Sequence, residues 1–307
     1  MSPTSDRLTY CKLAAVTMIW GGTFVAGRYL ADQLHPLLAA SLRFILASLA
    51  LLLFMGMSRT ALARPSLAQL AQLAVLGFFG IFFYNLCFFY GLHSINASRA
   101  SLIVALNPAV IGLASWLVFK ERLGRTQVLG IALCLGGAAT VIVSRNPQLM
   151  QATPSSGLGD LLIAGCVLAW AIYSLFSRGL NASLGPLQTV TWSVLLGTVM
   201  LCVTTALSGH FTIGGIAGLS QPQLLSLLYL GVFGSALAYI GYYDGIRRIG
   251  PTRSGVFIAL NPLTAVVCGA LLLDEQLTTP MLVGGAVILL GIYLCNKTLA
   301  RPKAMGI

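Results

Sequence analysis

Residues 105–108 read ALNP, and residues 259–262 read ALNP again, each time in the middle of a long apolar stretch. A proline removes one hydrogen bond of a helix, and an asparagine side chain in apolar surroundings needs a polar partner. Both residues are therefore costly at these places. Their repetition indicates that the chain uses one structural device twice.

The two tetrads belong to a longer internal repeat. Residues 77–137 match residues 231–291 at a constant offset of 154 without gaps. Further upstream the offset is 150, which pairs Trp20 with Trp170. Self-similarity at a fixed offset is the mark of duplicated structural units, so we expect the chain to consist of two similar halves.

The composition places both halves in a membrane. Of the 307 residues 57% are apolar and only 8% are charged, whereas soluble domains carry about a quarter charged residues. Ten apolar runs are long enough to cross a hydrocarbon core about 30 Å thick, and they are continuously apolar, which favours helices over barrel strands. The ten runs are residues 10–30, 36–56, 67–90, 97–118, 126–144, 158–179, 187–207, 222–245, 252–273 and 280–299.

The basic residues predict the orientation of these ten transmembrane helices. With the N-terminus inside, fourteen of the eighteen lysines and arginines fall on the inner side, three fall on the outer side, and Arg43 lies within the second run. Because basic loops favour the cytoplasmic side, both termini are predicted to be cytoplasmic. Five spans per half is an odd number, so the halves, residues 1–150 and 151–307, are predicted to be inverted repeats joined by the polar linker 144–157.

The sequence lacks the features that several other functions require. The basic residues form no patch for nucleic acid, and no phosphate-binding GxxxxGK[ST] loop is present, so neither nucleic-acid binding nor an ATPase subunit is expected. No acidic residue is predicted at mid-depth, which argues against proton coupling through a buried carboxylate. His35, His93 and His210 lie far apart in the sequence, so no metal site and no cofactor are expected. We predict that the chain is not an enzyme.

The tetrads are predicted to lie near the membrane midplane, because they fall near the centres of two repeat-related helices that cross in opposite directions. Pro108 and Pro262 leave the carbonyls four residues earlier without their helical donors. Asn107 and Asn261 add amides to the same regions. Broken helices at the midplane of an inverted repeat point to a substrate site. The alternative is a packing kink, in which the asparagine satisfies a neighbouring carbonyl.

A second group of candidates consists of polar and aromatic side chains predicted deep in the membrane, where they line a cavity or find packing partners. These candidates are Trp20, Tyr84, Asn85, Trp170, Tyr173 and Tyr239. Tyr242 and Tyr243 are predicted nearer the inner interface, as part of an aromatic belt. Phe88 is expected to face lipid or to serve packing.

Arg43 lies about seven residues into the second span, roughly 10 Å from its outer end. A charge at this depth is costly unless it faces a cavity or pairs with another group. Arg43 therefore binds a carboxylate or phosphate of the substrate, or it pairs with carbonyls at helix ends as a structural contact.

These features together resemble the EamA branch of the drug/metabolite transporter superfamily, and within it the YddG-type exporters of aromatic and other amino acids. The resemblance extends over nearly the whole chain. The motifs that carry it are the two ALNP tetrads, IWGGTF at 19–24, SLRF at 41–44, KERL at 120–123, GD at 159–160 and DEQL at 274–277.

The resemblance implies an inner-membrane exporter that moves small metabolites by alternating access. It implies a central cavity between the first, third, fourth, sixth, eighth and ninth spans, and it supplies no catalytic residue. The first span contains no glutamate, which argues against the proton-coupled cation mechanism of the four-span relatives.

We expect the substrates to be amino acids, aromatic and neutral ones included. Three other functions stay open at this point. They are efflux of aromatic organic cations, a receptor or scaffold without transport, and antiport of a sugar phosphate or nucleotide sugar, although a single buried arginine offers little charge to hold a phosphate.

Overall fold

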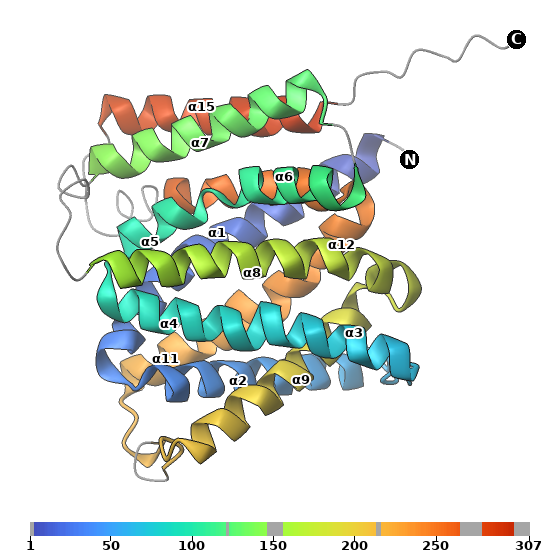
Figure 1. Ribbon diagram of the computed structural model, residues 1–307, viewed down its shortest axis with the longest axis vertical. Coiled ribbons are helices and arrows are strands. Elements are labelled where there is room, and N and C mark those ends of the chain that lie inside the picture. Colours follow the sequence, from blue (N-terminus) through green and yellow to red (C-terminus); the bar gives the residue numbers. More distant parts are fainter. Residues whose placement is uncertain (1–2, 121–122, 146–155, 213–215, 265–277, 298–307) are drawn as a thin grey trace, which may run out of the picture.

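The computed structural model describes residues 3–120, 123–145, 156–212, 216–264 and 278–297, and within these ranges it is helical without a strand (Figure 1). The α-helices are α1 (Pro3–Gln33), α2 (Pro36–Met57), α3 (Leu67–Gly77), α4 (Tyr84–Ser94), α5 (Ala97–Val104), α6 (Asn107–Phe119), α7 (Arg125–Arg145), α8 (Ser156–Ser183), α9 (Pro186–Leu207), α11 (Gln221–Leu228), α12 (Ala238–Ile249), α13 (Pro251–Gly255) and α15 (Thr279–Asn296). Two π-helical segments, η1 (Phe78–Phe83) and η3 (Tyr229–Leu237), and one 3₁₀ segment, η4 (Val256–Leu260), continue some of these helices.

The described residues contain nine helices that are long and apolar enough to cross a membrane. They correspond to nine of the ten predicted spans. The remaining predicted span, residues 252–273, begins with α13 and η4, and its later part lies outside the described residues. Most of the predicted linker and the DEQL motif lie outside them as well.

The repeat is visible in how the helices begin. Ser66 and Gln69 form a capping box at the start of α3, and their repeat mates Ser220 and Gln223 form the same capping box at the start of α11. Such a box satisfies two backbone N–H groups that have no partner within the helix. The duplicated sequence therefore places duplicated helix starts.

Helices α7 and α15 show that the two halves are inverted. A Cβ atom on Gly130 would lie 2.6 Å from the carbonyl oxygen of Gly291, and one on Gly137 would lie 2.6 Å from that of Gly284. Residue numbers rise along α7 while they fall along α15, so the two helices are antiparallel. Gly130 is the repeat mate of Gly284 and Gly137 that of Gly291, so each contact has its symmetric counterpart. The predicted inverted repeat is confirmed.

Helices α2 and α9 repeat this pattern with hydroxyl groups. Ser41 and Thr205 share a hydrogen bond of 2.8 Å, and Ser48 and Thr198 share one of 3.0 Å, all four side chains being buried. The contacts again run in antiparallel order. In a membrane, small residues and hydroxyl groups let helices approach closely and replace the hydrophobic effect as the source of cohesion.

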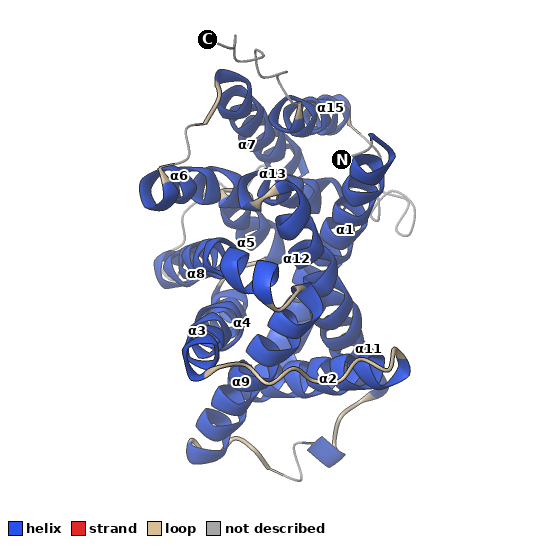
Figure 2. Ribbon diagram, turned by 90° about the vertical axis from the view of Figure 1, so that its right-hand side faces the viewer, coloured by secondary structure: helices blue, strands red, loops and turns tan. Residues whose placement is uncertain are grey.

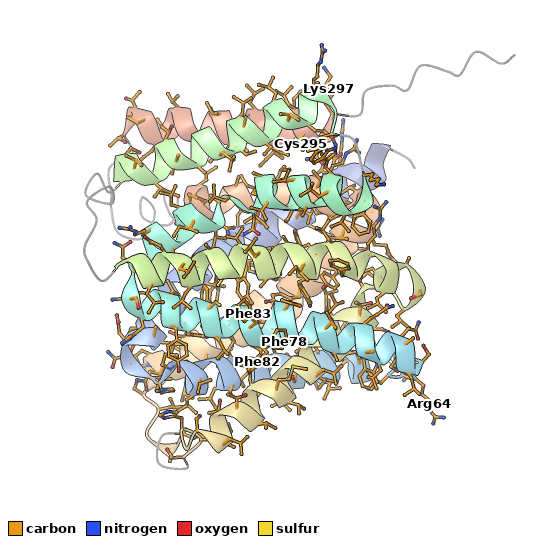
Figure 3. The ribbon with its side chains drawn as sticks, viewed as in Figure 1. Arg64, Phe78, Phe82, Phe83, Cys295 and Lys297 are labelled. Carbon is orange, nitrogen blue, oxygen red and sulfur yellow. The ribbon has the colours of Figure 1, made fainter. Side chains whose placement is uncertain are left out.

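The pairs α7/α15 and α2/α9 form opposite edges of an elongated bundle, and the other helices lie between them (Figures 1 and 2). Helix α1 begins and α15 ends at the same end of the bundle. Figure 3 shows Arg64 and Lys297 at this end, which we call the arginine-rich end. The central helices carry the polar residues that the sequence singled out.

Gly137 offers a direct test of the symmetric packing. We expect Gly137→Leu to destabilise the protein by about 1–3 kcal/mol or to prevent folding, because the new side chain would enter the backbone of α15. A Cβ atom on the adjacent Gly136 would meet no other atom within 4 Å, so Gly136→Leu is the matched control with the same gain in helix propensity. Thermal unfolding of the purified protein should show a lower Tm for Gly137→Leu alone; equal Tm values would refute the packing described.

Candidate functional site

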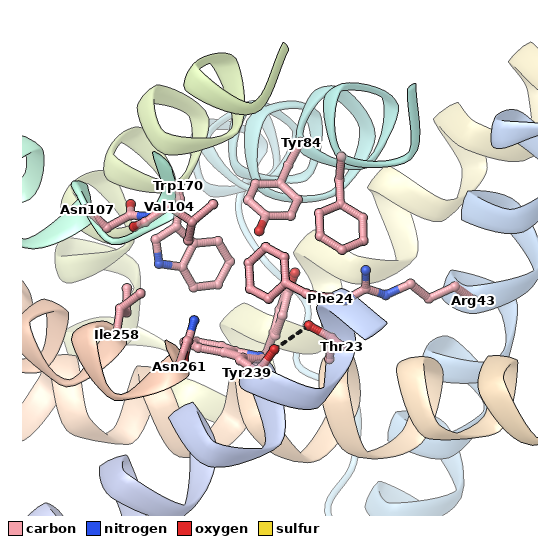
Figure 4. A pocket seen from close by; sticks show the side chains of 12 residues that line it. Thr23, Phe24, Arg43, Tyr84, Val104, Asn107, Trp170, Tyr239, Ile258 and Asn261 are labelled. Carbon is pink, nitrogen blue, oxygen red and sulfur yellow. Dashed lines mark hydrogen bonds between the residues drawn. The ribbon is translucent and has the colours of Figure 1, made fainter. Parts of the chain in front are cut away.

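A cavity lies at the centre of the bundle, where α1, α2, α4, α8, α12 and the two broken helices meet (Figure 4). Its volume is ≈ 30 Å³, about the room that two water molecules need. No amino acid fits into this space unless the helices part. Its lining consists of Trp20, Thr23, Phe24, Arg43, Tyr84, Phe88, Val104, Asn107, Trp170, Tyr239, Ile258 and Asn261.

The structure brings seven of the eleven candidate residues to this cavity, namely Trp20, Arg43, Tyr84, Asn107, Trp170, Tyr239 and Asn261. The other four lie outside its lining. Asn85 and Tyr173 are fully buried beside lining residues, and Pro108 and Pro262 form part of the interrupted helices.

The first tetrad splits its span into α5 and α6, with a turn at Ala105 and Leu106. Pro108 has no N–H for the carbonyl of Val104, and the side chain of Asn107 supplies the missing donor, with its Nδ2 at 2.9 Å from that oxygen. The Oδ1 atom of Asn107 is buried and has no hydrogen-bond partner among the described residues. The break therefore leaves one acceptor without a donor at the cavity.

The second tetrad acts on its span in a related way. The backbone tightens into the 3₁₀ segment η4 immediately before Asn261. A stretch of 3₁₀ helix in the middle of a helix often marks a hinge. The side chain of Asn261 is 3% exposed, and its Oδ1 atom is also buried without a partner among the described residues. The cavity thus receives a second acceptor that lacks a donor.

Arg43 is 3% exposed and lies on the opposite side of the cavity from the two asparagines (Figure 4). Its Nε donates to Oγ of Ser235 at 2.9 Å, and its Nη1 donates to Oδ1 of Asn85 at 3.1 Å. Both acceptors are neutral. None of the ion pairs among the described residues involves Arg43. The cavity therefore faces a buried cation whose charge has no counter-ion among the described residues. A guanidinium has five N–H donors, which is more than these two hydrogen bonds use.

The π-helical segment η3 positions two of these groups. Ser235 donates to the carbonyl of Leu230 at 2.9 Å, which turns its oxygen toward Arg43. The carbonyl of Gly234 accepts from Nε1 of Trp20 at 2.9 Å and fixes the indole ring. A π-helical turn releases backbone groups from the regular ladder, which is why such turns recur at functional sites.

Six aromatic residues line the cavity, and three of them, Trp20, Tyr84 and Tyr239, pack around Trp170. The ring centroids of Trp20 and Trp170 are 5.1 Å apart at an interplanar angle of 86°, so the two repeat mates meet edge to face. Trp170 also lies 5.3 Å from Tyr239 and 5.7 Å from Tyr84. Edge-to-face packing exposes the electron-rich faces of some rings, which attract cations.

Sequence reasoning missed part of the lining and misplaced two tyrosines. Thr23 and Phe24 were missed, although both lie one helical turn after Trp20. Phe88 was expected to face lipid or to serve packing; it packs against Phe24 and Tyr84 and in addition lines the cavity. Tyr242 and Tyr243 were assigned to an interfacial belt, yet both are 0% exposed, and the hydroxyl of Tyr243 donates to the carbonyl of Tyr173 at 3.2 Å. Both side chains therefore lie in the interior of the bundle.

The three histidines converge at the end of the bundle opposite the arginine-rich end, although they lie far apart in the sequence. The rings of His35 and His210 stack with centroids 3.4 Å apart. Burial, together with the nearby His210 and His93, lowers the pKa of His35. The described residues hold no group of three side chains suited to a metal ion.

Comparison with known proteins gives a consistent result. The EamA-like transporter family matches residues 7–143 and again residues 157–297. The chain is 27% identical to the uncharacterized transporter YyaM of Bacillus subtilis, over 96% of this chain and 95% of that protein. It is 28% identical to a probable amino-acid metabolite efflux pump of Salmonella typhimurium, over 91% of both chains.

Two further proteins are similar to this chain. A probable terminal-alkyne amino-acid exporter of Streptantibioticus cattleyicolor is 26% identical over 95% of this chain and 94% of its own length. A crystal structure described only as that of a protein superposes with a TM-score of 0.76 at 20% identity, over 96% of this chain and 98% of that one. At this identity the superposition shows the shared fold alone.

Proposed function

This chain belongs to the EamA-like transporter family, and from that premise we propose that it exports amino acids across the bacterial inner membrane by alternating access. The family and the nine apolar helices establish a multi-pass membrane protein of a transporter family. The choice of amino acids, the direction of transport and the membrane are the proposal. The arginine-rich end would face the cytoplasm.

The observation that carries the proposal is the buried Arg43, which has no acidic partner among the described residues. A charge buried in a membrane costs several kcal/mol unless it is compensated, roughly 3 kcal/mol or more at the centre of a helix. The carboxylate of an amino acid would supply the missing counter-ion, and a guanidinium can bind it through two parallel hydrogen bonds. The substrate therefore completes a site that is electrostatically incomplete without it.

The rest of the cavity suits the opposite charge. An ammonium group donates hydrogen bonds and accepts none, and the Oδ1 atoms of Asn107 and Asn261 are acceptors without donors among the described residues. The faces of Trp20 and Trp170 add cation–π attraction. The cavity thus has a cationic side chain on one side, which suits a carboxylate, and hydrogen-bond acceptors on the other, which suit an ammonium group. This arrangement favours a zwitterion over a simple cation or anion.

Transport requires the cavity to open, because its present volume excludes every amino acid. The inverted repeat offers a way to do so, since rocking of one half against the other exposes a central site to alternate sides. The interrupted helices at the two tetrads can bend at their breaks. Aromatic and neutral amino acids match a lining in which half of the residues are aromatic.

The names of two relatives agree with this proposal, since one is a probable amino-acid metabolite efflux pump and the other a probable terminal-alkyne amino-acid exporter. Efflux of aromatic organic cations is the second candidate, and the aromatic rings around the cavity favour it. Against it stands Arg43, because a buried cation repels another cation in a medium of low dielectric.

Counterflow in proteoliposomes tests the proposal. Vesicles that contain the purified protein and a high internal concentration of unlabelled phenylalanine should accumulate labelled phenylalanine transiently, and protein-free vesicles should not. Neutral amino acids should compete with the label. If no amino acid exchanges while the protein shows a cooperative unfolding transition, amino-acid transport is ruled out, and a receptor or scaffold becomes the better interpretation.

A further inference from the structure

A second, larger opening lies at the arginine-rich end of the bundle. Figure 2 shows this end, with α12 and α13 toward the viewer. Its volume is ≈ 600 Å³, and Leu123 and the helices α7, α8, α12 and α13 contribute to its walls. We call it the vestibule. Four arginines line it, namely Arg178, Arg247, Arg248 and Arg253.

The described residues that line the vestibule include four arginines and no acid. Asp244 is the acid that pairs with its arginines among the described residues, and it is shared by three cations. Its carboxylate lies 3.3 Å from Arg247, 2.9 Å from Arg248 and 3.6 Å from Lys12. An opening walled by one sign of charge concentrates ions of the opposite sign.

The internal repeat shows what Arg253 lacks. Its repeat mate Arg99 forms a forked ion pair with Asp160 at the opposite end of the bundle, with N···O distances of 2.7 and 2.6 Å. At the position equivalent to Asp160 the first half carries Tyr10, which stacks on Phe257. No carboxylate of the described residues pairs with Arg253. The second copy of the pair therefore has the arginine but, among the described residues, no acid.

Thr252 supplies an independent observation. Its side chain lines the vestibule and is 7% exposed, and its hydroxyl has no hydrogen-bond partner among the described residues. A buried hydroxyl without a partner is costly, so such groups in folded proteins normally bind something. The tendency of cytoplasmic loops to be basic explains arginines at this end, but it explains neither this hydroxyl nor the missing acid.

We propose that the vestibule is a second ligand site, in which Arg253 and Thr252 hold an oxyanion, either a carboxylate or a phosphate group. In this site the guanidinium of Arg253 binds the ligand as the guanidinium of Arg99 binds the carboxylate of Asp160. The hydroxyl of Thr252 donates a hydrogen bond to a ligand oxygen. The oxyanion belongs to a dissolved solute or to the headgroup of an anionic lipid.

The vestibule and the central cavity share the helices α8 and α12. Arg178 and Trp170 lie eight residues apart on α8, and Arg247 and Tyr239 lie eight residues apart around α12, which is about 12 Å along each helix. The buried Tyr242 lies between the two levels. That the oxyanion is the carboxylate of a transported solute rests on the function proposed above; the binding of an oxyanion does not.

Calorimetric titration of inorganic phosphate tests the site, with the full-length protein in phosphatidylcholine nanodiscs. We expect saturable binding that Arg253→Gln weakens about tenfold and Thr252→Val about threefold, the usual size of a charge-assisted and a neutral hydrogen bond. Arg64→Gln removes the same charge from the same end but outside the vestibule, and it should change the Kd less than twofold. Acetate should compete.

A second arm of the experiment identifies the source of the oxyanion. If phosphatidylglycerol in the nanodisc abolishes the phosphate signal, the lipid headgroup occupies the site, and if the signal persists, the site takes a dissolved anion. The proposal is overturned if folded wild-type protein binds no phosphate in phosphatidylcholine, or if Arg64→Gln weakens binding as much as Arg253→Gln. Phosphate binding without amino-acid counterflow would refute the proposed function and leave this site standing.

Discussion

Arg43→Gln should reduce amino-acid transport about 100-fold at low substrate concentration, because a buried charge pair with the substrate carboxylate is lost at a cost of about 3 kcal/mol. The same change should leave the free energy of unfolding unchanged or raise it. It removes a buried charge that has no counter-ion among the described residues, and such a charge destabilises the empty protein. Transport per folded protein and Tm should therefore move independently.

The matched control is Arg99→Gln. Arg99 has a carboxylate partner in Asp160, so its replacement leaves a partly buried acid without compensation and should lower Tm. Transport per folded protein should change little, because Arg99 is not among the residues that line the cavity. The structural interpretation of Arg43, in which it only holds helices together, predicts the reverse for Arg43→Gln: a lower Tm with full transport by the protein that remains folded.

Asn107→Ala and Asn261→Ala should each lower transport per folded protein about tenfold, since each removes an acceptor that we assign to the ammonium group of the substrate. Asn107→Ala should also cost about 1 kcal/mol of stability, because the carbonyl of Val104 loses its donor. Asn261→Ala removes no hydrogen bond among the described residues, so its Tm should stay close to that of the wild type.

Asn296→Ala is the control for this pair. Asn296 is buried, donates from Nδ2 to the carbonyl of Ile292 at 3.0 Å and also has an Oδ1 without a partner among the described residues, but it lies outside the cavity. Its replacement should affect stability alone. If Asn107→Ala and Asn261→Ala lower Tm and keep full transport per folded protein, the tetrads are packing kinks.

The sequence was sufficient to predict the architecture. An odd number of spans in each copy of the repeat requires inversion, and the glycine contacts between α7 and α15 confirm it. The position of the tetrads within their spans was sufficient to predict where two helices are interrupted. Both inferences rest on covalent or topological constraints, which tertiary packing cannot override.

Other features could not be predicted, because no local pattern encodes them. The lipid-facing and inward-facing sides of a transmembrane helix are both apolar, so Phe88 gives no sign in the sequence that it lines the cavity. The π-helical segments η1 and η3 contain ordinary helix-compatible residues, so their sequences do not distinguish them from α-helix. The convergence of His35 and His210 likewise depends on tertiary structure alone.

Binding of a matched series of ligands tests the central claim most directly, and the fluorescence of Trp20 and Trp170 in the cavity provides the signal. The series consists of phenylalanine, its carboxamide, which lacks the carboxylate, and 3-phenylpropionate, which lacks the ammonium group. We predict that phenylalanine binds at least about tenfold more tightly than either analogue, and that Arg43→Gln removes the preference over the carboxamide. If the carboxamide binds wild-type protein as tightly as phenylalanine does, Arg43 holds no carboxylate and the cavity is a site for organic cations.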